Sequence, residues 1–140
     1  ETAAQGKMYV STVILPDGKV FETGGGLHNR ADPVYEASMF NPQTNTFTPG
    51  MATDPVPRTY HSSALLLPDG RVMAVGDNPG DGSFDNRVSI YSPPYLFQGG
   101  TRPAITNVAS TQWAYGSAQT VTVNSTVTPT AISTNRIAPR

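Results

Sequence analysis

The sequence predicts an all-β protein. Thirteen Gly and thirteen Pro among 140 residues supply many tight turns, and the Thr, Val, Ile and Tyr residues between them favour short strands. A Pro-Asp-Gly turn occurs twice, at residues 16–18 and 68–70, and each copy lies between two β-rich runs. The composition, the turns and the repeat that they mark define the fold class.

The first two predicted strands form a hairpin. Residues 8–15 are β-rich and alternate loosely, and residues 20–23 follow after the turn Pro16-Asp17-Gly18. Pro presets φ at the first corner, Asp accepts backbone hydrogen bonds, and Gly adopts the left-handed conformation that returns the chain. We expect the glycines at 24–26 to end the second strand and a polar loop to follow over residues 27–33.

Two more strands complete this unit. Residues 35–40 alternate enough to form a strand, which Asn41-Pro42 closes, and residues 45–49 form a short outer strand with one aromatic residue. A Pro-interrupted loop over residues 51–58 then leads to the next unit.

The whole unit recurs further along the chain. Pro68-Asp69-Gly70 lies 52 residues after its first copy, and Tyr91-Ser92-Pro93 lies 51 residues after Phe40-Asn41-Pro42. A period of about 50 residues, with about four short strands and glycines after the second, is typical of a blade of a kelch-type β-propeller. We therefore predict two kelch blades over residues 1–100.

Two blades cannot close a propeller, which has about four to eight. The apolar runs at residues 13–15 and 65–67 fit strands that neighbouring blades cover on both faces. We therefore expect the remaining blades to come from a longer or companion polypeptide. Without them, we expect self-association of the isolated chain through its uncovered faces.

The sequence changes character after residue 100. Three Thr/Val-rich runs are predicted strands, at residues 101–105, 120–123 and 131–133. They predict the start of an immunoglobulin-like β-sandwich over residues 101–140, which is incomplete because such a sandwich needs about seven strands. We expect Trp113 and Tyr115 in the sandwich core, with an aromatic patch for sugar as the alternative.

Composition and charge exclude several classes of function. Nine Lys plus Arg against ten Asp plus Glu leave no basic face for nucleic acid. The sequence has no apolar run near the ~20 residues of a membrane helix and no cysteine for disulfides, thiolate chemistry or zinc-ribbon sites. The polar, uncharged composition and the sequon Asn124-Ser125-Thr126 favour an extracellular or cell-surface location.

The two histidines, His28 and His61, are the candidates for metal binding or acid–base chemistry. His28 is interpreted as a solvated loop residue. His61 follows Tyr60, and an offset of 51 places this pair opposite Tyr9-Val10, whereas a slip of one residue pairs Tyr9 with His61. Neighbouring strand residues point to opposite faces, so both side chains reach one metal only if they lie off the strand. We expect this arrangement just after Arg58-Thr59, at the mouth of the strand.

Two other patterns resemble ligand loops. Residues 77–85 are Asp- and Gly-rich, but Pro79 occupies a ligand position of a calcium loop and the terminal Glu is absent, so a turn-rich loop is predicted. The glycines at 24–26 precede no helix, which argues against a phosphate cradle.

Four blocks of sequence together resemble the galactose oxidase and glyoxal oxidase family of copper-radical oxidases. The blocks, in order and with compatible spacing, are residues 58–62, 65–72, 91–97 and 101–105. The resemblance covers about residues 8–140 and implies a kelch propeller followed by a β-sandwich. It also implies one copper ion that serves the oxidation of alcohols or aldehydes by O₂, with release of H₂O₂.

The resemblance gives roles to two residues of this chain. It makes Tyr60 an axial copper ligand and general base, and His61 an equatorial copper ligand, and N and O donors suit Cu(II). The radical cofactor of the family is a tyrosine cross-linked to a cysteine, which this chain lacks. By the resemblance, the second histidine ligand follows residue 140. We therefore expect copper in the complete parent protein and not in this chain alone.

The expected function is that of a fragment of a secreted copper-radical oxidase, inactive alone, which holds the last two propeller blades and the first strands of the sandwich. The alternative is a non-catalytic kelch-like protein that binds carbohydrate or has a structural role in an assembly. The absence of cysteine favours the alternative, and the Tyr60-His61 pair favours the enzyme.

Overall fold

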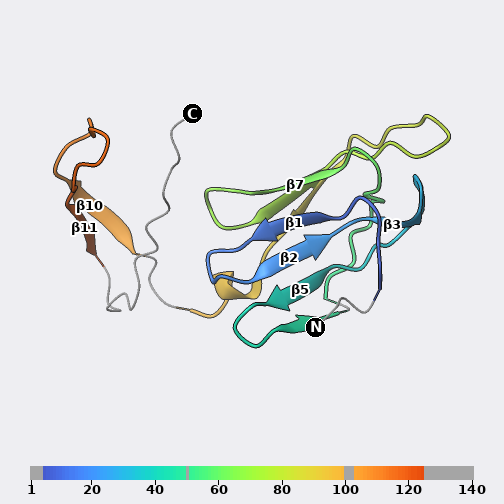
Figure 1. Ribbon diagram of the computed structural model, residues 1–140, viewed down its shortest axis with the longest axis horizontal. Coiled ribbons are helices and arrows are strands. Elements are labelled where there is room, and N and C mark those ends of the chain that lie inside the picture. Colours follow the sequence, from blue (N-terminus) through green and yellow to red (C-terminus); the bar gives the residue numbers. More distant parts are fainter. Residues whose placement is uncertain (1–4, 50, 100–102, 125–140) are drawn as a thin grey trace. The chain divides into compact units, whose positions relative to one another are not determined.

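The computed structural model describes residues 5–49, 51–99 and 103–124 (Figure 1). The chain divides into two compact units, Glu1–Gln98 and Gly99–Arg140, and each is considered by itself. Within the described ranges the elements are short strands and one 3₁₀ turn, η1 (Pro94–Leu96). The all-β prediction is therefore confirmed. None of the helical segments in these ranges is long and apolar enough to span a membrane.

The first unit contains an antiparallel four-stranded sheet in the order β1-β2-β5-β6. Its strands are β1 (Ser11–Ile14), β2 (Val20–Thr23), β5 (Ser38–Asn41) and β6 (Thr46–Thr48). The first hairpin closes where the Leu15 N–H donates to the Lys19 carbonyl at 2.8 Å. Gly18 has φ 81°, the left-handed conformation that this turn requires.

A three-stranded antiparallel sheet follows in the same unit. Its strands are β7 (Ser63–Leu66), β8 (Val72–Val75) and β9 (Val88–Tyr91). The hairpin between β7 and β8 repeats the first one: the Leu67 N–H donates to the Arg71 carbonyl at 2.8 Å, and Gly70 has φ 86°. The repeat seen in the sequence is therefore also a repeat of backbone geometry.

The two hairpins superpose in sequence at an offset of 52. Strands β1 and β7, and strands β2 and β8, begin and end 52 residues apart. The offset falls to 51 at the third strand, because Val20 pairs with Phe40 whereas Val72 pairs with Tyr91. The residue that the repeat loses therefore lies after β8.

One face of each sheet forms the shared core of the first unit. The buried residues include Val13, Phe21 and Val72, and the Phe21 and Tyr91 rings stack with centroids 4.2 Å apart. Tyr95 packs against this cluster, and its hydroxyl donates to the Gly70 carbonyl. Two strands that are distant in sequence thus meet across a common apolar layer.

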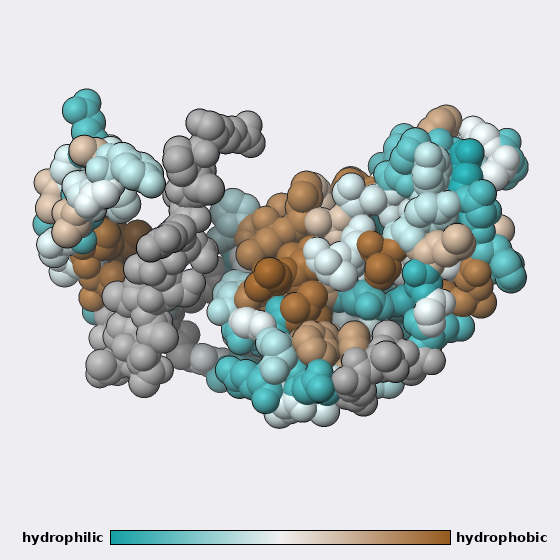
Figure 2. All heavy atoms as spheres, viewed as in Figure 1, coloured by the Kyte–Doolittle hydropathy of each residue, from teal (hydrophilic) through white to brown (hydrophobic). Residues whose placement is uncertain are grey.

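Among the described residues, the opposite faces of these strands carry exposed apolar side chains. Ile14 is 72% exposed and Leu65 is 53% exposed, although each belongs to a continuous apolar run. In β1 one face is buried, with Val13 7% exposed, whereas in β7 both Leu65 and Leu66 are exposed. The burial on both faces was expected from neighbouring blades, which these residues do not include. Figure 2 shows hydrophobic residues gathered over the middle of the first unit.

A small hairpin takes the place of the polar loop predicted over residues 27–33, and that prediction is wrong. Strand β3 (Gly26–His28) pairs with β4 (Ala31–Pro33). The hairpin is tied to the start of the chain by paired backbone hydrogen bonds between Met8 and Gly26, of 2.8 and 3.0 Å. Residues 27–33 are mostly polar and show no apolar alternation, so the sequence pattern did not predict strands here. The strands form through backbone hydrogen bonds.

The second unit has one antiparallel pair among its described residues, β10 (Ala104–Val108) and β11 (Val121–Asn124), with an irregularity between Ile105 and Asn107. Trp113 and Tyr115 are 57% and 89% exposed, so the prediction that they lie in a core is wrong for the described segment. The strand predicted at 131–133 lies outside the described residues, as do Ser125 and Thr126 of the sequon.

Candidate functional site

Tyr60 and His61 lie in a tight turn immediately before β7. The Ser62 N–H donates to the Thr59 carbonyl at 3.3 Å, and the Ser62 hydroxyl donates to the same oxygen at 2.8 Å. The regular strand begins only at Ser63. The two candidate side chains are therefore off the strand, as the sequence predicted.

His61 has a left-handed backbone, with φ 61°. Positive φ at the third residue of a turn is normally left to Gly or Asn, and it costs an ordinary residue roughly 1–2 kcal/mol. The Gly76 backbone packs directly against this turn, because a Cβ at Gly76 would lie 2.9 Å from the His61 carbonyl oxygen. The site thus combines local strain with a close approach of the Gly76 backbone, directly after β8.

The repeat supplies a structural counterpart for each residue of the pair. Tyr9 has φ 61° and precedes β1 as His61 precedes β7. The Asn78 N–H donates to the Tyr60 carbonyl just as the Gly26 N–H, 52 residues earlier, donates to Met8. The offset of 51 that pairs Tyr60 with Tyr9 is therefore wrong here, and the one-residue slip holds: Tyr9 corresponds to His61.

Three rings gather at this turn. The Tyr60 and His61 rings stack with centroids 3.8 Å apart and planes at 26°, and the Tyr9 ring meets Tyr60 edge-on at 5.1 Å and 69°. The Tyr9 hydroxyl donates to the Asn29 side-chain oxygen. His61 is exposed and Tyr60 is half-buried, so the imidazole faces solvent beside a phenol ring that contacts two other rings.

Arg58 fixes the chain just before the pair. This side chain is 2% exposed and its guanidinium donates to four acceptors from three segments: the Asp54 carboxylate at 3.3 Å, the Gly76 carbonyl at 3.1 Å, the Arg87 carbonyl at 2.9 Å and the Ser89 hydroxyl at 2.8 Å. A buried cation is tolerated when its donors are satisfied and a carboxylate balances it. The network locks the loop that carries Tyr60 onto the second sheet.

Asp77 provides a second anchor on the same turn. Its carboxylate accepts from the Thr59 N–H at 2.6 Å and from the Thr59 hydroxyl at 2.5 Å, and both residues are buried. Charge-assisted hydrogen bonds of this kind are among the stronger ones in proteins. The residues on the N-terminal side of Tyr60 are therefore held by two buried charged groups.

The donor set of this turn fits part of a copper site. A phenol oxygen and an imidazole nitrogen are ligands that Cu(II) accepts, and they stand on adjacent stacked rings. Among the described residues, no group of three or more His, Cys, Asp or Glu side chains gathers to hold a metal.

His28 lies at a different position, at the end of β3. Its Nδ1 is 2.6 Å from an Asp32 carboxylate oxygen, and the two side chains are 75% and 61% exposed. Its interpretation as a solvated histidine is confirmed.

The two loops that resembled ligand sites are engaged in internal contacts. The hydrogen bond from the Arg87 guanidinium lowers the pKa of Asp85 to about 2, and Asp81 accepts from Ser83, as in a turn-rich loop. The Gly25 N–H donates to the Arg58 carbonyl at 2.7 Å, so that amide already has an acceptor within the chain. Both sequence interpretations are therefore consistent with the structure.

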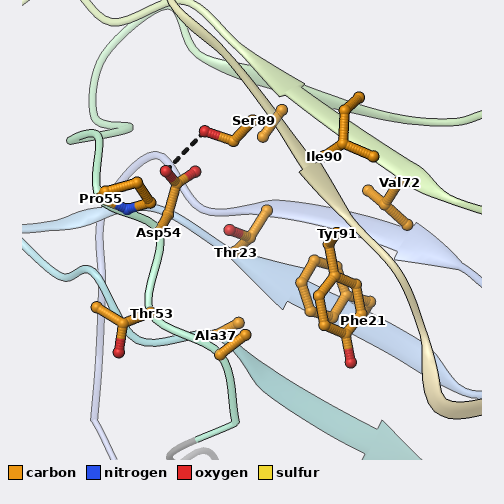
Figure 3. Close-up of a pocket in the computed structure, with 12 residues that line it drawn as sticks. Phe21, Thr23, Ala37, Thr53, Asp54, Pro55, Val72, Ser89, Ile90 and Tyr91 are labelled. Atoms are coloured by element: carbon orange, nitrogen blue, oxygen red, sulfur yellow. Dashed lines mark hydrogen bonds between the residues drawn. The ribbon is translucent and has the colours of Figure 1, made fainter.

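A separate cavity of about 100 Å³ lies between the two sheets (Figure 3). Its walls include Phe21 and Tyr91, whose phenol pKa is raised by burial, and at one end the Ser89 hydroxyl donates to Asp54 at 2.7 Å. Tyr60 and His61 do not line it. The one carboxylate in its lining, that of Asp54, already accepts a hydrogen bond from Arg58. We therefore interpret the cavity as a packing gap beside Arg58.

Sequence reasoning did not place two side chains at this site, those of Tyr9 and Arg30. The one-residue slip, which pairs Tyr9 with His61, is the sequence signal for the position of Tyr9. Arg30, whose guanidinium carbon lies 4.8 Å from the centroid of the Tyr60 ring, gave no signal, because its partners are 48 and 49 residues away.

Comparison with known proteins shows relatives along most of the chain. A WSC domain-containing protein of Arthroderma benhamiae is 35% identical over 79% of the chain, galactose oxidase of Gibberella zeae is 32% identical over 90%, and aldehyde oxidase GLOX1 of Arabidopsis thaliana is 32% identical over 79%. The chain spans only 13%, 20% and 21% of these relatives, respectively. No family model matches the sequence.

A solved structure shares the fold. It is a fungal alcohol oxidase of the AA5 family in complex with copper, which matches 88% of this chain and 28% of its own with a TM-score of 0.73 and 29% identity. The chain is thus an all-β protein built like part of a copper-containing oxidase. More narrowly, it is a partial-length relative of the galactose oxidase and glyoxal oxidase family.

Proposed function

We propose that this chain is part of a copper-radical oxidase in which Tyr60 and His61 bind the copper. The observation that carries the proposal is the geometry of the turn: the two rings stack at 3.8 Å, off the strand, over two buried charged anchors. Such rigid support is what a metal site needs, since ligand orientation is set by the residues behind the ligands. The likeness to galactose oxidase and aldehyde oxidases supplies the reaction class.

The reaction is the oxidation of an alcohol to an aldehyde, or of a hydrated aldehyde to an acid, with reduction of O₂ to H₂O₂. Two electrons and two protons pass from the substrate to O₂. Tyr60 and His61 would hold the copper, which would supply Lewis-acid and redox chemistry at this site. The side-chain oxygen of Tyr60 would accept the substrate hydroxyl proton, and His61 would hold the metal beside it.

The rest of the site lies in other parts of a longer polypeptide in this proposal. The sequence contains no cysteine for the cross-linked tyrosine cofactor, and the described residues offer two ligands. The exposed apolar face of β7 and β9, with Leu65 53% and Ile90 44% exposed, is suited to packing against a further propeller blade. The short coverage of the relatives agrees with this.

We further propose an extracellular or cell-surface location for the parent protein. Asn124, the first residue of the sequon, is exposed at the end of β11, where a glycan would meet solvent.

The alternative is a non-catalytic kelch-like protein that binds carbohydrate or has a structural role. It is favoured by the lack of cysteine and by the 35% identity to a WSC domain-containing protein, whose name does not describe an oxidase. The exposed Trp113 and Tyr115 rings would offer a sugar its apolar contact.

The Tyr60→Phe variant of the longer polypeptide tests the catalytic role. Removal of the hydroxyl should lower the turnover of an alcohol or aldehyde by a factor of about 10²–10⁴, because the proton acceptor is lost while the ring still stacks on His61. Peroxide formation in a peroxidase-coupled assay measures the effect, and Tyr35→Phe, a change at an exposed tyrosine, is the matched control. Turnover by Tyr60→Phe equal to that of the control would exclude Tyr60 as the base.

A further inference from the structure

Arg30 joins the small hairpin to the candidate copper site. It lies in the two-residue connection between β3 and β4, with φ 59°, and its guanidinium lies over the Tyr60 ring at 4.8 Å from the centroid. This distance is within the ~6 Å range of a cation–π contact. A strained backbone thus presents a cation to the ring of the proposed ligand.

The same guanidinium bonds the segment that holds the Tyr60 backbone. Its Nε donates to the Asn78 carbonyl at 3.0 Å, and its Nη2 donates to the Asn78 side-chain oxygen at 2.5 Å and to the Pro79 carbonyl at 3.1 Å. The Asn78 N–H donates in turn to the Tyr60 carbonyl at 2.8 Å. Arg30, Asn78 and Tyr60 therefore form a closed set of contacts around one tyrosine.

The chemistry of these contacts is specific to arginine. All three hydrogen-bond acceptors are neutral amide oxygens, so none of them pairs the positive charge. The charge lies over the Tyr60 ring and also acts on the Asp81 carboxylate. A planar fork can reach several acceptors and stack at the same time, whereas a lysine ammonium is a single point of charge. The backbone is also fixed, because the Gly80 N–H donates to the Arg30 carbonyl at 3.2 Å.

We propose that Arg30 is a positioning residue of this site: it holds the plane of the Tyr60 ring, and so keeps the phenol oxygen beside the imidazole of His61. The metal part of this inference rests on the proposed function. The part that concerns the ring orientation is independent of the proposed function, because the contacts that set this orientation are present in the copper-free protein.

Nuclear magnetic resonance of the copper-free protein, with ¹³C-labelled tyrosine rings, tests the orientation. The Tyr60 signals are assigned with Tyr60→Phe. Arg30→Met and Arg30→Lys should shift the Tyr60 ring signals and remove the nuclear Overhauser contact between the Tyr60 and His61 rings. Arg71→Met is the matched control, because Arg71 lies at the other end of the same β7–β8 hairpin and bonds Asp69, and it should leave both unchanged.

Thermal melting establishes that each variant folds. A folded Arg30→Met with unchanged Tyr60 signals and the contact to His61 intact would overturn the proposal. Should Arg30→Met fail to fold, Arg30→Lys decides by the same two readouts. If neither variant folds, Arg30 is a stability residue and the proposal is wrong.

Titration with Cu(II) of the longer polypeptide separates this inference from the proposed function. If both hold, Arg30→Lys weakens copper affinity about 10-fold, the lower end of the range for residues that orient metal ligands, and reduces the phenolate-to-copper absorption band. If the wild-type protein binds no copper, the proposed function fails, while a shifted Tyr60 ring in the copper-free variants still supports the role of Arg30.

Discussion

At the scale of single residues, two buried charged groups determine where the Tyr60-His61 pair stands. The buried Arg58 guanidinium donates hydrogen bonds to four acceptors, of which one is a carboxylate, in place of water. The buried Asp77 carboxylate accepts two hydrogen bonds from Thr59 in place of water. A buried ion pair gives little net stability against an apolar substitute, but removal of one partner leaves the other charge buried and unpaired. Loss of Arg58 or of Asp77 is therefore expected to displace the Tyr60-His61 turn.

The Arg58→Met variant tests this dependence. It should reduce the free energy of unfolding by about 3 kcal/mol or more, because Asp54, whose side chain is 9% exposed, keeps its charge without the guanidinium. Urea denaturation, monitored by far-ultraviolet circular dichroism, measures the loss of unfolding free energy. Arg87→Met, which removes an exposed arginine paired with Asp85, should have little effect. Equal effects of the two substitutions would contradict the account.

At the scale of elements, glycine backbones allow the strands to approach the loop that carries the site. Gly24, at the end of β2, has φ 72°, and a Cβ there would lie 2.5 Å from the Arg58 carbonyl oxygen. Gly76 lies 52 residues after Gly24, and a Cβ there would lie 2.9 Å from the His61 carbonyl oxygen. Because the neighbouring atoms are backbone, no rotamer change can make room. The repeated glycines after the second strand therefore have a packing role.

The substitutions Gly24→Ala and Gly18→Ala separate close approach from backbone strain. Both residues have positive φ, but a Cβ at Gly18 would meet nothing within 4 Å. Gly18→Ala should therefore cost only the left-handed penalty of about 1–2 kcal/mol. Gly24→Ala should cost a further ~1–3 kcal/mol for overpacking. Chemical denaturation of both variants gives the comparison, and equal losses would show that the approach to Arg58 is unimportant.

At the scale of the whole molecule, the two sheets share one core, and within the described part of the first unit each also has exposed apolar side chains on its other face. Leu65, Val88 and Ile90 on the second sheet are 53%, 57% and 44% exposed, and they lie on paired strands of one sheet. An apolar patch of this kind on an isolated chain favours association.

The isolated chain is therefore predicted to self-associate, and the double variant Leu65→Lys with Ile90→Lys is predicted to do so less. Two charges on the patch oppose its burial against another copy. Analytical ultracentrifugation over a range of concentrations measures the association. Asn86→Lys, a change in an exposed loop, is the control. A wild-type chain that is monomeric throughout the range would refute this prediction.

The sequence predicted those features that depend on neighbouring residues. Pro-Asp-Gly specifies its hairpin locally, and the prolines and the turn before Ser63 specify that Tyr60 and His61 lie off the strand. The contributions of Tyr9 and Arg30 depend on contacts between distant segments, 48 residues apart in the case of Arg30 and Asn78, and no local pattern encodes them. The sequence left two registers open for Tyr9, at offsets of 51 and 52. The Pro-Asp-Gly turns favour 52, and strand pairing places the lost residue after β8.

Copper content is the most direct test of the central claim that His61 is a metal ligand. The longer polypeptide, purified as wild type, His61→Ala and His28→Ala, is loaded with Cu(II), desalted and measured for copper per chain by mass spectrometry. His28 is the control because it is the other histidine of the sequence and lies exposed beside Asp32. One copper per chain is expected in the wild type and in His28→Ala, and none in His61→Ala. Full copper content in a folded His61→Ala protein would contradict the claim.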